Sequence, residues 1–269
     1  MLHNTTLSLG EEDREYIWDL LVNLHWGAVG QIIMIDILLG GDNAVVIAMA
    51  CRNLPHEQRA KGIFWGTAGA IALRVVLITF AVMLLDLPFL KAAGGLLLLW
   101  IGVKLLIPEF DSHEKIEGSS KLLGAIKTII VADFVMSFDN VIAIAGAAQQ
   151  AHEAHQTLLI IFGLVVSVPF IVFGSQIILK LLDRFPIIIY FGGGLLGWIA
   201  GGMMVSDGYV ATHWPEFSFT AHYPACVVGA LLVIIIGHFI AKKKRAEHEA
   251  NLKLHRIDRS SAETAGKEA

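Results

Sequence analysis

The residues best suited to chemistry in this chain lie inside apolar segments. The stretch IDILLGGDNAVVIAM is apolar enough to cross a membrane, yet it contains Asp36, Asp42 and Asn43. An ionised Asp at the centre of a bilayer costs about 2.5–3.5 kcal/mol on insertion scales, so such a carboxylate marks a functional site by default. Carboxylate and amide oxygens are the donors that hard divalent cations prefer.

The same motif occurs a second time. The stretch DFVMSFDNVIAIA repeats DILLGGDNAVVIA after 97 positions, so Asp133, Asp139 and Asn140 repeat the first three polar residues. A single Asp-Asn pair inside an apolar segment is as often a polar contact between packed helices as a site, but its repetition favours function. The six residues offer four carboxylates and two amide oxygens. We predict a site for Mn²⁺, Mg²⁺ or Ca²⁺. The set contains no thiolate or imidazole, which are the ligands that Zn²⁺ or Cu⁺ would favour.

A regular helix does not aim the first three polar residues at one point. A helix turns about 100° per residue, so Asp36 and Asn43 share a face while Asp42 points about 120° away from Asp36. The adjacent Gly40 and Gly41 permit a break or kink, which would turn Asp42 inward and free backbone carbonyls as ligands.

Two further polar residues are candidates for support of the site. Ser137 stands where the first motif has Gly40, and its hydroxyl either bends the helix by bonding a carbonyl one turn back or serves as a ligand. Four carboxylates around one divalent ion leave two surplus negative charges. Either some carboxyl groups hold a proton, which is a route to proton exchange, or a cation lies nearby. Arg74 is the candidate cation, with direct ion gating as its alternative role.

The composition indicates a membrane protein with several spans. The 269 residues are 55% hydrophobic and only 16% charged, with a mean hydropathy of +0.66, whereas soluble domains contain about a quarter charged residues. We therefore predict an all-α membrane protein with seven transmembrane helices. The apolar segments run over residues 27–50, 63–85, 88–107, 122–148, 157–181, 186–206 and 224–241.

The match between the two motifs extends along the chain. Segments one to three and four to six align at offsets of 97 or 98 residues. Because each unit has three spans, the second enters the membrane from the opposite side, which is the inverted-topology repeat of many secondary transporters. The aligned pairs are Gly66 with Gly163, Pro88 with Pro186, Gly94 with Gly192, Gly95 with Gly193, and Trp100 with Trp198.

The distribution of Lys and Arg predicts an N-out, C-in orientation. The outside segments hold only Arg14 and Lys91, while the inside segments hold Arg52, Arg59, Lys61, Lys104, Lys115, Lys121, Lys127, Lys180, Arg184 and the basic residues of the C-terminal tail. The regions are a periplasmic segment (1–26), repeat one (27–107), a cytoplasmic loop (108–121), repeat two (122–206), a periplasmic loop with the seventh helix (207–241), and a polar cytoplasmic tail (242–269) that forms a frayed helix or stays disordered.

Cysteine and histidine receive structural interpretations. We expect no disulfide between Cys51 and Cys226, because the topology places them near opposite membrane faces. Among the external histidines, the HEAH stretch from His152 to His155 is interpreted as a solvated loop, with a weak metal-collecting surface as the alternative. His238 is interpreted as a residue satisfied by helix packing, with assistance of proton movement as the alternative. The external set is His3, His25, His152, His155, His213 and His222.

On these motifs the chain resembles the TerC family of membrane proteins, and its YjbE-type members most. The family pattern is approximately Asp-x-x-Leu-Ser-x-Asp-Asn, present twice; the second copy has Met136 in the Leu place, and the first has Gly40 in the Ser place. The resemblance covers about residues 27–240. It implies seven spans, a relation to the LysE-type and cation-exchanger superfamily, and manganese export as the activity of several members.

We therefore expect a divalent cation exporter of the bacterial inner membrane, with Mn²⁺ as the favoured transported ion and alternating access as its mechanism. Exchange for H⁺ is a further hypothesis. No enzyme activity, prosthetic group or nucleic-acid partner is expected; protein partners are left open. One alternative is a non-transporting membrane partner that supplies metal to exported proteins. Another is an intramembrane aspartyl protease, although the usual Gly-x-Gly-Asp is absent because Leu39 occupies its first position.

Overall fold

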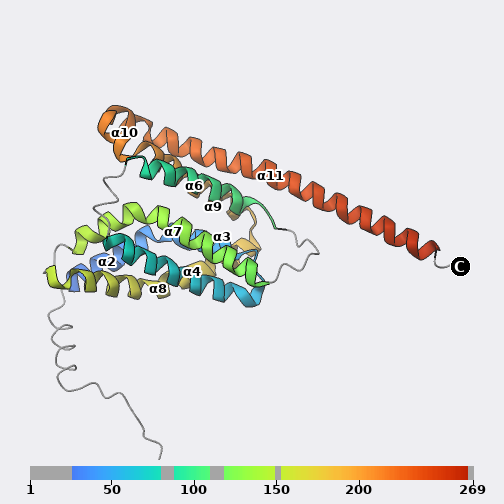
Figure 1. The fold of residues 1–269 in the computed structure, drawn as a ribbon, viewed down its shortest axis with the longest axis horizontal. Coiled ribbons are helices and arrows are strands. Elements are labelled where there is room, and N and C mark those ends of the chain that lie inside the picture. Colours follow the sequence, from blue (N-terminus) through green and yellow to red (C-terminus); the bar gives the residue numbers. More distant parts are fainter. Residues whose placement is uncertain (1–25, 80–87, 110–117, 149–152, 266–269) are drawn as a thin grey trace, which may run out of the picture.

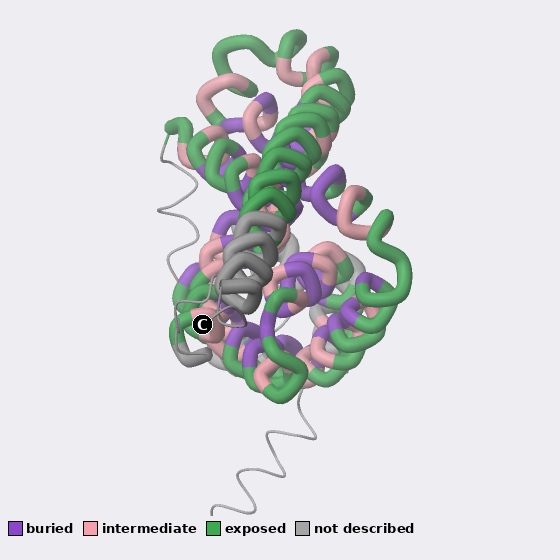
Figure 2. The backbone as a smooth tube through the Cα atoms, turned by 90° about the vertical axis from the view of Figure 1, so that its right-hand side faces the viewer, coloured by how far each residue is buried: buried purple, intermediate pink, exposed green. Residues whose placement is uncertain are grey.

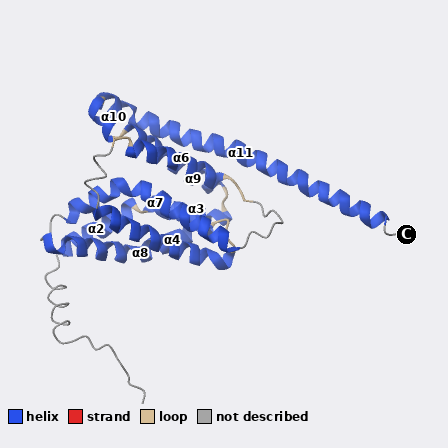
Figure 3. Cartoon of the chain, in the orientation of Figure 1, coloured by secondary structure: helices blue, strands red, loops and turns tan. Residues whose placement is uncertain are grey.

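In a computed structural model, the described residues are 26–79, 88–109, 118–148 and 153–265. Within these ranges the chain forms helices joined by turns and loops, in agreement with the predicted all-α class (Figure 3). The helices are α2 (Trp26–Leu39), α3 (Gly41–Cys51), α4 (His56–Thr79), α6 (Leu90–Leu106), α7 (Gly118–Ala148), α8 (Glu153–Arg184), α9 (Ile187–Val205), α10 (Gly208–His213) and α11 (Pro215–Ala265).

Several helices have the length and composition of membrane spans. Among the described residues, four stretches meet both criteria, and α3 is a shorter apolar helix. Large apolar side chains such as Phe191 and Phe219 point outward, with 72% and 85% of their surface exposed. Apolar surface of this extent is rare on soluble proteins and needs lipid around it. The four stretches are His56–Ile78, Ile161–Arg184, Ile187–Val205 and Pro215–Leu252.

The helices form two adjoining groups (Figure 1). One group contains α2, α3, α4, α7 and α8, and the other contains α6, α9, α10 and α11. The closest packing joins α4 to α7, α2 and α3 to α8, α6 to α9, and α9 to α11. Buried residues lie where these helices face one another, and exposed ones cover the outside (Figure 2). The buried core includes Val46, Ile47 and Met49 of α3, so the segment after the glycine pair lies at the centre of the protein.

Helices α9 and α11 pack through their glycines. A Cβ placed on Gly197 would lie 2.3 Å from the carbonyl oxygen of Gly229, and one on Gly201 would lie 2.1 Å from that of Ala225. Only a residue without a side chain allows two backbones to approach this closely, which is the packing that small residues provide between membrane helices. The sequence FGGGLLGWIAGG therefore serves helix packing at these positions.

Asp207 ties together two helix starts, a role that the sequence did not reveal. Its carboxylate accepts hydrogen bonds from the backbone N–H groups of Lys91 (3.1 Å) and Ala92 (3.2 Å) in α6, and of Tyr209 (3.0 Å) in α10. It also accepts from Phe89 (3.1 Å), the N-cap of α6, whose φ of 61° is left-handed. The N–H groups at the start of a helix have no partner within that helix, so the buried Asp207 carboxylate stabilises the starts of both α6 and α10.

The helix ends differ from the predicted segments, most of all in α11. This helix begins at Pro215 and not at residue 224, and it continues through the polar tail to Ala265. Hydropathy marks only the apolar part of a helix, whereas its backbone hydrogen bonds extend through Lys, Glu and Ala, which are good helix formers. Proline suits the first helical position because its missing N–H has no partner there. Residues 1–25 of the predicted periplasmic segment lie outside the described residues.

Candidate polar site within the helix bundle

The first motif contains the predicted helix break. Helix α2 ends at Leu39, α3 begins at Gly41, and Gly40 lies between them with φ −93° and ψ −1°. These angles are open to any residue, so glycine is required here for space. A Cβ at position 40 would lie 2.3 Å from the carbonyl oxygen of Asp36 and 3.7 Å from Cδ1 of Ile171, whereas one at Gly41 would meet nothing within 4 Å.

This difference gives a matched pair of variants. Gly40→Ala is expected to destabilise the protein by about 1–3 kcal/mol, because the added methyl group forces the backbone at the break to move. Gly41→Ala is expected to be neutral or to stabilise by up to about 1 kcal/mol, because Ala loses less entropy in a helix. Thermal unfolding of both variants in detergent measures the contrast; equal stability of the two would contradict the assigned role of Gly40.

A buried arginine joins the two motifs. Arg74 of α4 donates from Nη1 to Oδ1 of Asp36 in α2 and from Nη2 to Oδ1 of Asp133 in α7, the latter over 2.6 Å. The three residues are 2%, 1% and 6% exposed. A charge this deeply buried requires an opposite charge and hydrogen bonds. The guanidinium therefore holds together two carboxylates that lie far apart in sequence.

Serine hydroxyl groups complete this cluster. Ser137 Oγ donates to Oδ2 of Asp133 (3.0 Å) and accepts from Nε of Arg74 (3.2 Å). On the other side, Ser167 Oγ of α8 donates to Oδ2 of Asp36. The first motif has Gly40 in place of the serine, and a residue from a different helix supplies the missing hydroxyl. Each carboxylate thus accepts one bond from Arg74 and one from a serine.

The remaining polar residues of the first motif lie just beyond the break. Asp42 accepts a hydrogen bond from the backbone N–H of Asn43 over 2.8 Å. The Asn43 side chain is 4% exposed, and within the described part of the chain neither its Oδ1 nor its Nδ2 has a hydrogen-bond partner. An unpaired buried polar group costs about 1–3 kcal/mol. Such an amide marks a place where a ligand or a second conformation supplies the missing contacts.

The structure brings together only part of the predicted set. Asp36, Asp133 and Ser137 meet around Arg74, while Asp42 and Asn43 lie on the following helix. Asp139 and Asn140 belong to the helical backbone of α7, but their side chains lie outside what the structure describes. Among the described residues, no group of three or more His, Cys, Asp and Glu side chains lies close enough to hold a metal ion.

Ser167 was absent from the predicted set. Its segment is apolar and carries no acidic motif, so only the packing of α2 against α8 reveals its contact with Asp36. Arg74 was predicted as a nearby counter-charge, and the ion pairs confirm that role. The arrangement also differs from a protease dyad, in which two carboxyl groups share a proton, because Arg74 lies between Asp36 and Asp133.

The cysteines are buried, whereas the exposed His213 and His238 each lie within hydrogen-bond distance of one group of the protein. Cys51 and Cys226 are free, buried thiols. His213 Nδ1 lies 3.0 Å from the carbonyl oxygen of Tyr209, and His238 Nδ1 lies 3.2 Å from the hydroxyl of Tyr190. The expected HEAH surface includes His152, which lies outside the described residues.

Comparisons with known proteins agree with the resemblance seen in the motifs. The family described as "Integral membrane protein TerC family" matches residues 22–245. The membrane protein YjbE of Bacillus subtilis is 46% identical over 195 residues, covering 72% of this chain and 83% of YjbE. YceF of the same organism is 25% identical over 239 residues, covering 84% and 87% of the two chains.

A third relative adds a location. The inner membrane protein YgdQ of Escherichia coli K12 is 27% identical over 184 residues, covering 60% of this chain and 73% of YgdQ. No solved structure matches the chain.

Proposed function

Because the chain belongs to the TerC family of integral membrane proteins, we propose that it exports divalent metal cations, with Mn²⁺ as the favoured ion. The observation that carries this proposal is the convergence of the first Asp of both motifs, Asp36 and Asp133, on one buried cationic group between membrane helices. A buried position between helices that stabilises a positive charge suits a transported cation. The location, by similarity to YgdQ, is the bacterial inner membrane.

The chemistry of the donors favours a hard divalent ion. Asp36, Asp133 and Asp42 provide carboxylate oxygens, and Asn43 provides an amide oxygen that has no hydrogen-bond partner among the described residues. We assign Asp139 and Asn140 to the same set, because their positions in the second motif correspond to Asp42 and Asn43. Oxygen ligands of this kind bind Mn²⁺, Mg²⁺ or Ca²⁺.

Arg74 supplies positive charge to the same carboxylates that would bind a transported cation. In the structure it neutralises one of the two negative charges of Asp36 and Asp133, and a divalent ion in its place would neutralise both. We infer that Arg74 moves away from one or both carboxylates when the ion binds and returns when it leaves. Four aspartates with Arg74 and one divalent ion carry a net charge of −1, so one bound proton would complete neutrality and couple export to H⁺ exchange.

The packing of the helices supports two repeats related by a pseudo-two-fold axis. In this comparison α2–α3, α4 and α6 of the first repeat correspond to α7, α8 and α9 of the second. The contact between α4 and α7 then corresponds to the contact between α8 and α3. The contact between α6 and α7 corresponds to the contact between α9 and α3. Individual positions follow the same rule, because Arg74 contacts Ser137 while its counterpart Ile171 lies beside Gly40. Rocking of one repeat against the other would then expose the site alternately to each side, with the N-terminus outside.

Flux measurements on membrane vesicles that contain the protein test the function. In everted membrane vesicles, whose outer surface is the cytoplasmic one, we expect Mn²⁺ to accumulate in the lumen, and an acidic lumen to accelerate its entry. Empty vesicles provide the background rate. Mn²⁺ binding without flux would replace export by the supply of metal to exported proteins, whereas flux that ignores the pH gradient would remove proton exchange. Competition among Mn²⁺, Mg²⁺, Ca²⁺, Zn²⁺ and Fe²⁺ identifies the preferred ion.

A further inference from the structure

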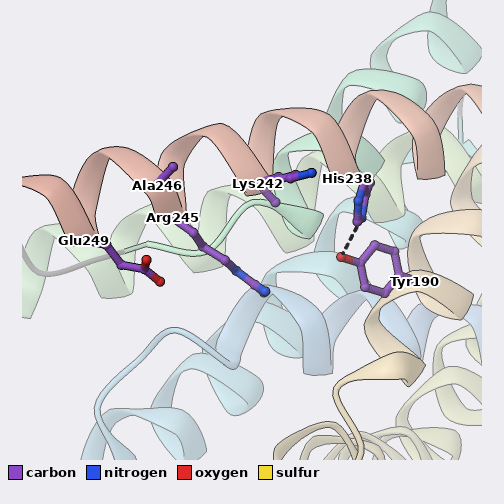
Figure 4. A pocket seen from close by; sticks show the side chains of 7 residues that line it. Tyr190, His238, Lys242, Arg245, Ala246 and Glu249 are labelled. Atoms are coloured by element: carbon purple, nitrogen blue, oxygen red, sulfur yellow. Dashed lines mark hydrogen bonds between the residues drawn. The ribbon is translucent and has the colours of Figure 1, made fainter.

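A cavity of about 250 Å³ lies where α11 passes from its apolar to its charged part (Figure 4). One side is formed by Tyr190 of α9, whose hydroxyl lies 3.2 Å from Nδ1 of His238. The other side is one face of α11, which carries Lys242 and Arg245 near His238. This pocket is separate from the Arg74 cluster and has no part in the proposed transport.

The pocket has a surplus of positive charge. In the described part of the chain, neither Lys242 nor Arg245 takes part in an ion pair, and Glu249 is the only acidic residue that lines the cavity. Lys243, which does not line the cavity, lies 3.9 Å from Glu247. The unpaired cations of this stretch of α11 therefore include the two that face the cavity, where an anion would compensate them.

Arg52, which does not line the cavity, is a further cationic residue with N–H donors that lack a partner among the described residues. It follows the end of α3, and its Nη2 donates to the carbonyl oxygen of Ile107 at 3.5 Å. Its Nε and Nη1 are buried without a partner among the described residues. Burial lowers the pKa of the Arg52 guanidinium, and the positive charge of Arg245 lowers it further. Buried N–H donors of a guanidinium that lack a partner form strong, charge-assisted hydrogen bonds with an anion.

Exposed apolar side chains lie close in sequence to the residues that line the pocket. On α11, Phe239 and Ile240 are 65% and 42% exposed, and on α9, Ile187 and Phe191 are 65% and 72% exposed. Ile187 lies about one helical turn before Tyr190, and the other three residues are sequence neighbours of cavity residues. The surroundings thus combine an anion-binding end with an apolar wall, which matches a molecule that has a phosphate head and hydrocarbon tails.

We propose that this pocket binds an anionic phospholipid, with its phosphate held by Lys242, Arg245 and the Tyr190 hydroxyl and its acyl chains along the exposed Ile and Phe side chains. Basic pockets between membrane helices on the cytoplasmic side bind such head groups. A free phosphate shares the charge but not the tails, so the apolar wall favours the lipid. The bound lipid fixes the depth at which α11 leaves the bilayer and stabilises its contact with α9.

The test compares two double variants of the purified full-length protein in neutral detergent. Lys242→Gln with Arg245→Gln removes the pocket cations, and Lys243→Gln with Lys244→Gln makes the same charge change on neighbouring positions that do not line the cavity. Native mass spectrometry measures binding of phosphatidylglycerol and of phosphatidylcholine with identical acyl chains. We expect the native protein to bind phosphatidylglycerol in preference to phosphatidylcholine. Phosphatidylglycerol should bind the pocket variant about 30-fold more weakly than it binds the native protein. It should bind the control variant no more than about threefold more weakly than the native protein.

Three results would overturn the proposal. Equal loss in both double variants would mean general attraction to a basic helix. Equal binding of phosphatidylglycerol and phosphatidylcholine would mean that the phosphate pocket makes no selection. Displacement of phosphatidylglycerol by inorganic phosphate or glycerol 3-phosphate at similar concentrations would assign the pocket to a soluble anion. Thermal unfolding of both lipid-free variants verifies that these exposed substitutions leave the fold intact.

Discussion

Asp133→Asn is expected to reduce Mn²⁺ transport by about 100-fold or more. The substitution keeps the shape of the side chain but removes one of the two negative charges that meet at Arg74. The variant offers a divalent ion one charged ligand fewer. Arg74 also has one carboxylate partner fewer, so its positive charge repels the incoming ion more strongly. Asp36→Asn is expected to have an effect of the same order, because that residue occupies the equivalent place in the other motif. The initial rate of Mn²⁺ entry into proteoliposomes measures both.

Asp183→Asn is the matched control for these variants. Asp183 lies on the surface of the protein and pairs with Arg59 over 2.5 Å, outside the buried cluster. Since exposed pairs of this kind contribute at most about 1 kcal/mol, transport should remain within about twofold of the native rate. Normal Mn²⁺ flux through a folded Asp133→Asn protein would exclude the cluster as the ion pathway.

Arg74→Gln is expected to lower the free energy of unfolding by about 3–5 kcal/mol. The variant leaves Asp36 and Asp133 buried near each other without the cation that joins them. Combining it with Asp133→Asn should recover part of the loss, because the second change removes one uncompensated charge; a double-mutant cycle on unfolding midpoints in detergent measures this coupling.

The same variant distinguishes an internal counter-cation from a purely structural arginine. If Arg74 occupies the place of the transported ion, added Mn²⁺ should stabilise Arg74→Gln more than the native protein, because the ion no longer competes with the guanidinium. Monovalent salt at equal ionic strength provides the control. Identical stabilisation of both proteins by Mn²⁺ would contradict competition at this position, while leaving the transport measurement to decide the function independently.

Much of the site followed from residue types and spacing. The doubled Asp motif inside apolar segments, the break at Gly40 and the counter-charge at Arg74 were all predicted from single features of the chain. Each has a local physical basis: carboxylates are costly in lipid, glycine permits close backbone approach, and a mid-span arginine needs a negative partner. The segments that became helices were found as well, although charged helix ends escaped a measure based on hydropathy.

Other features depended on contacts between distant parts of the chain. Ser167 bonds to Asp36 across 131 positions, and Asp207 reaches back to Lys91 across 116. Neither residue differs in its local sequence from serines and aspartates without such a role. Arg52 likewise resembles an ordinary positive-inside residue in the sequence, and only the fold buries its Nε and Nη1 without a partner among the described residues.

By itself, the amino-acid sequence determined that this is an all-α membrane protein of the TerC family with two copies of an acidic motif, because hydropathy and repetition are properties of the linear chain. The tertiary structure alone decided that Asp36 and Asp133 share one arginine, that a serine from α8 replaces the hydroxyl missing at Gly40, and that Lys242 and Arg245 line one cavity with Tyr190. These contacts depend on which helix faces match in packing, and that choice is made by side-chain shape across the whole bundle.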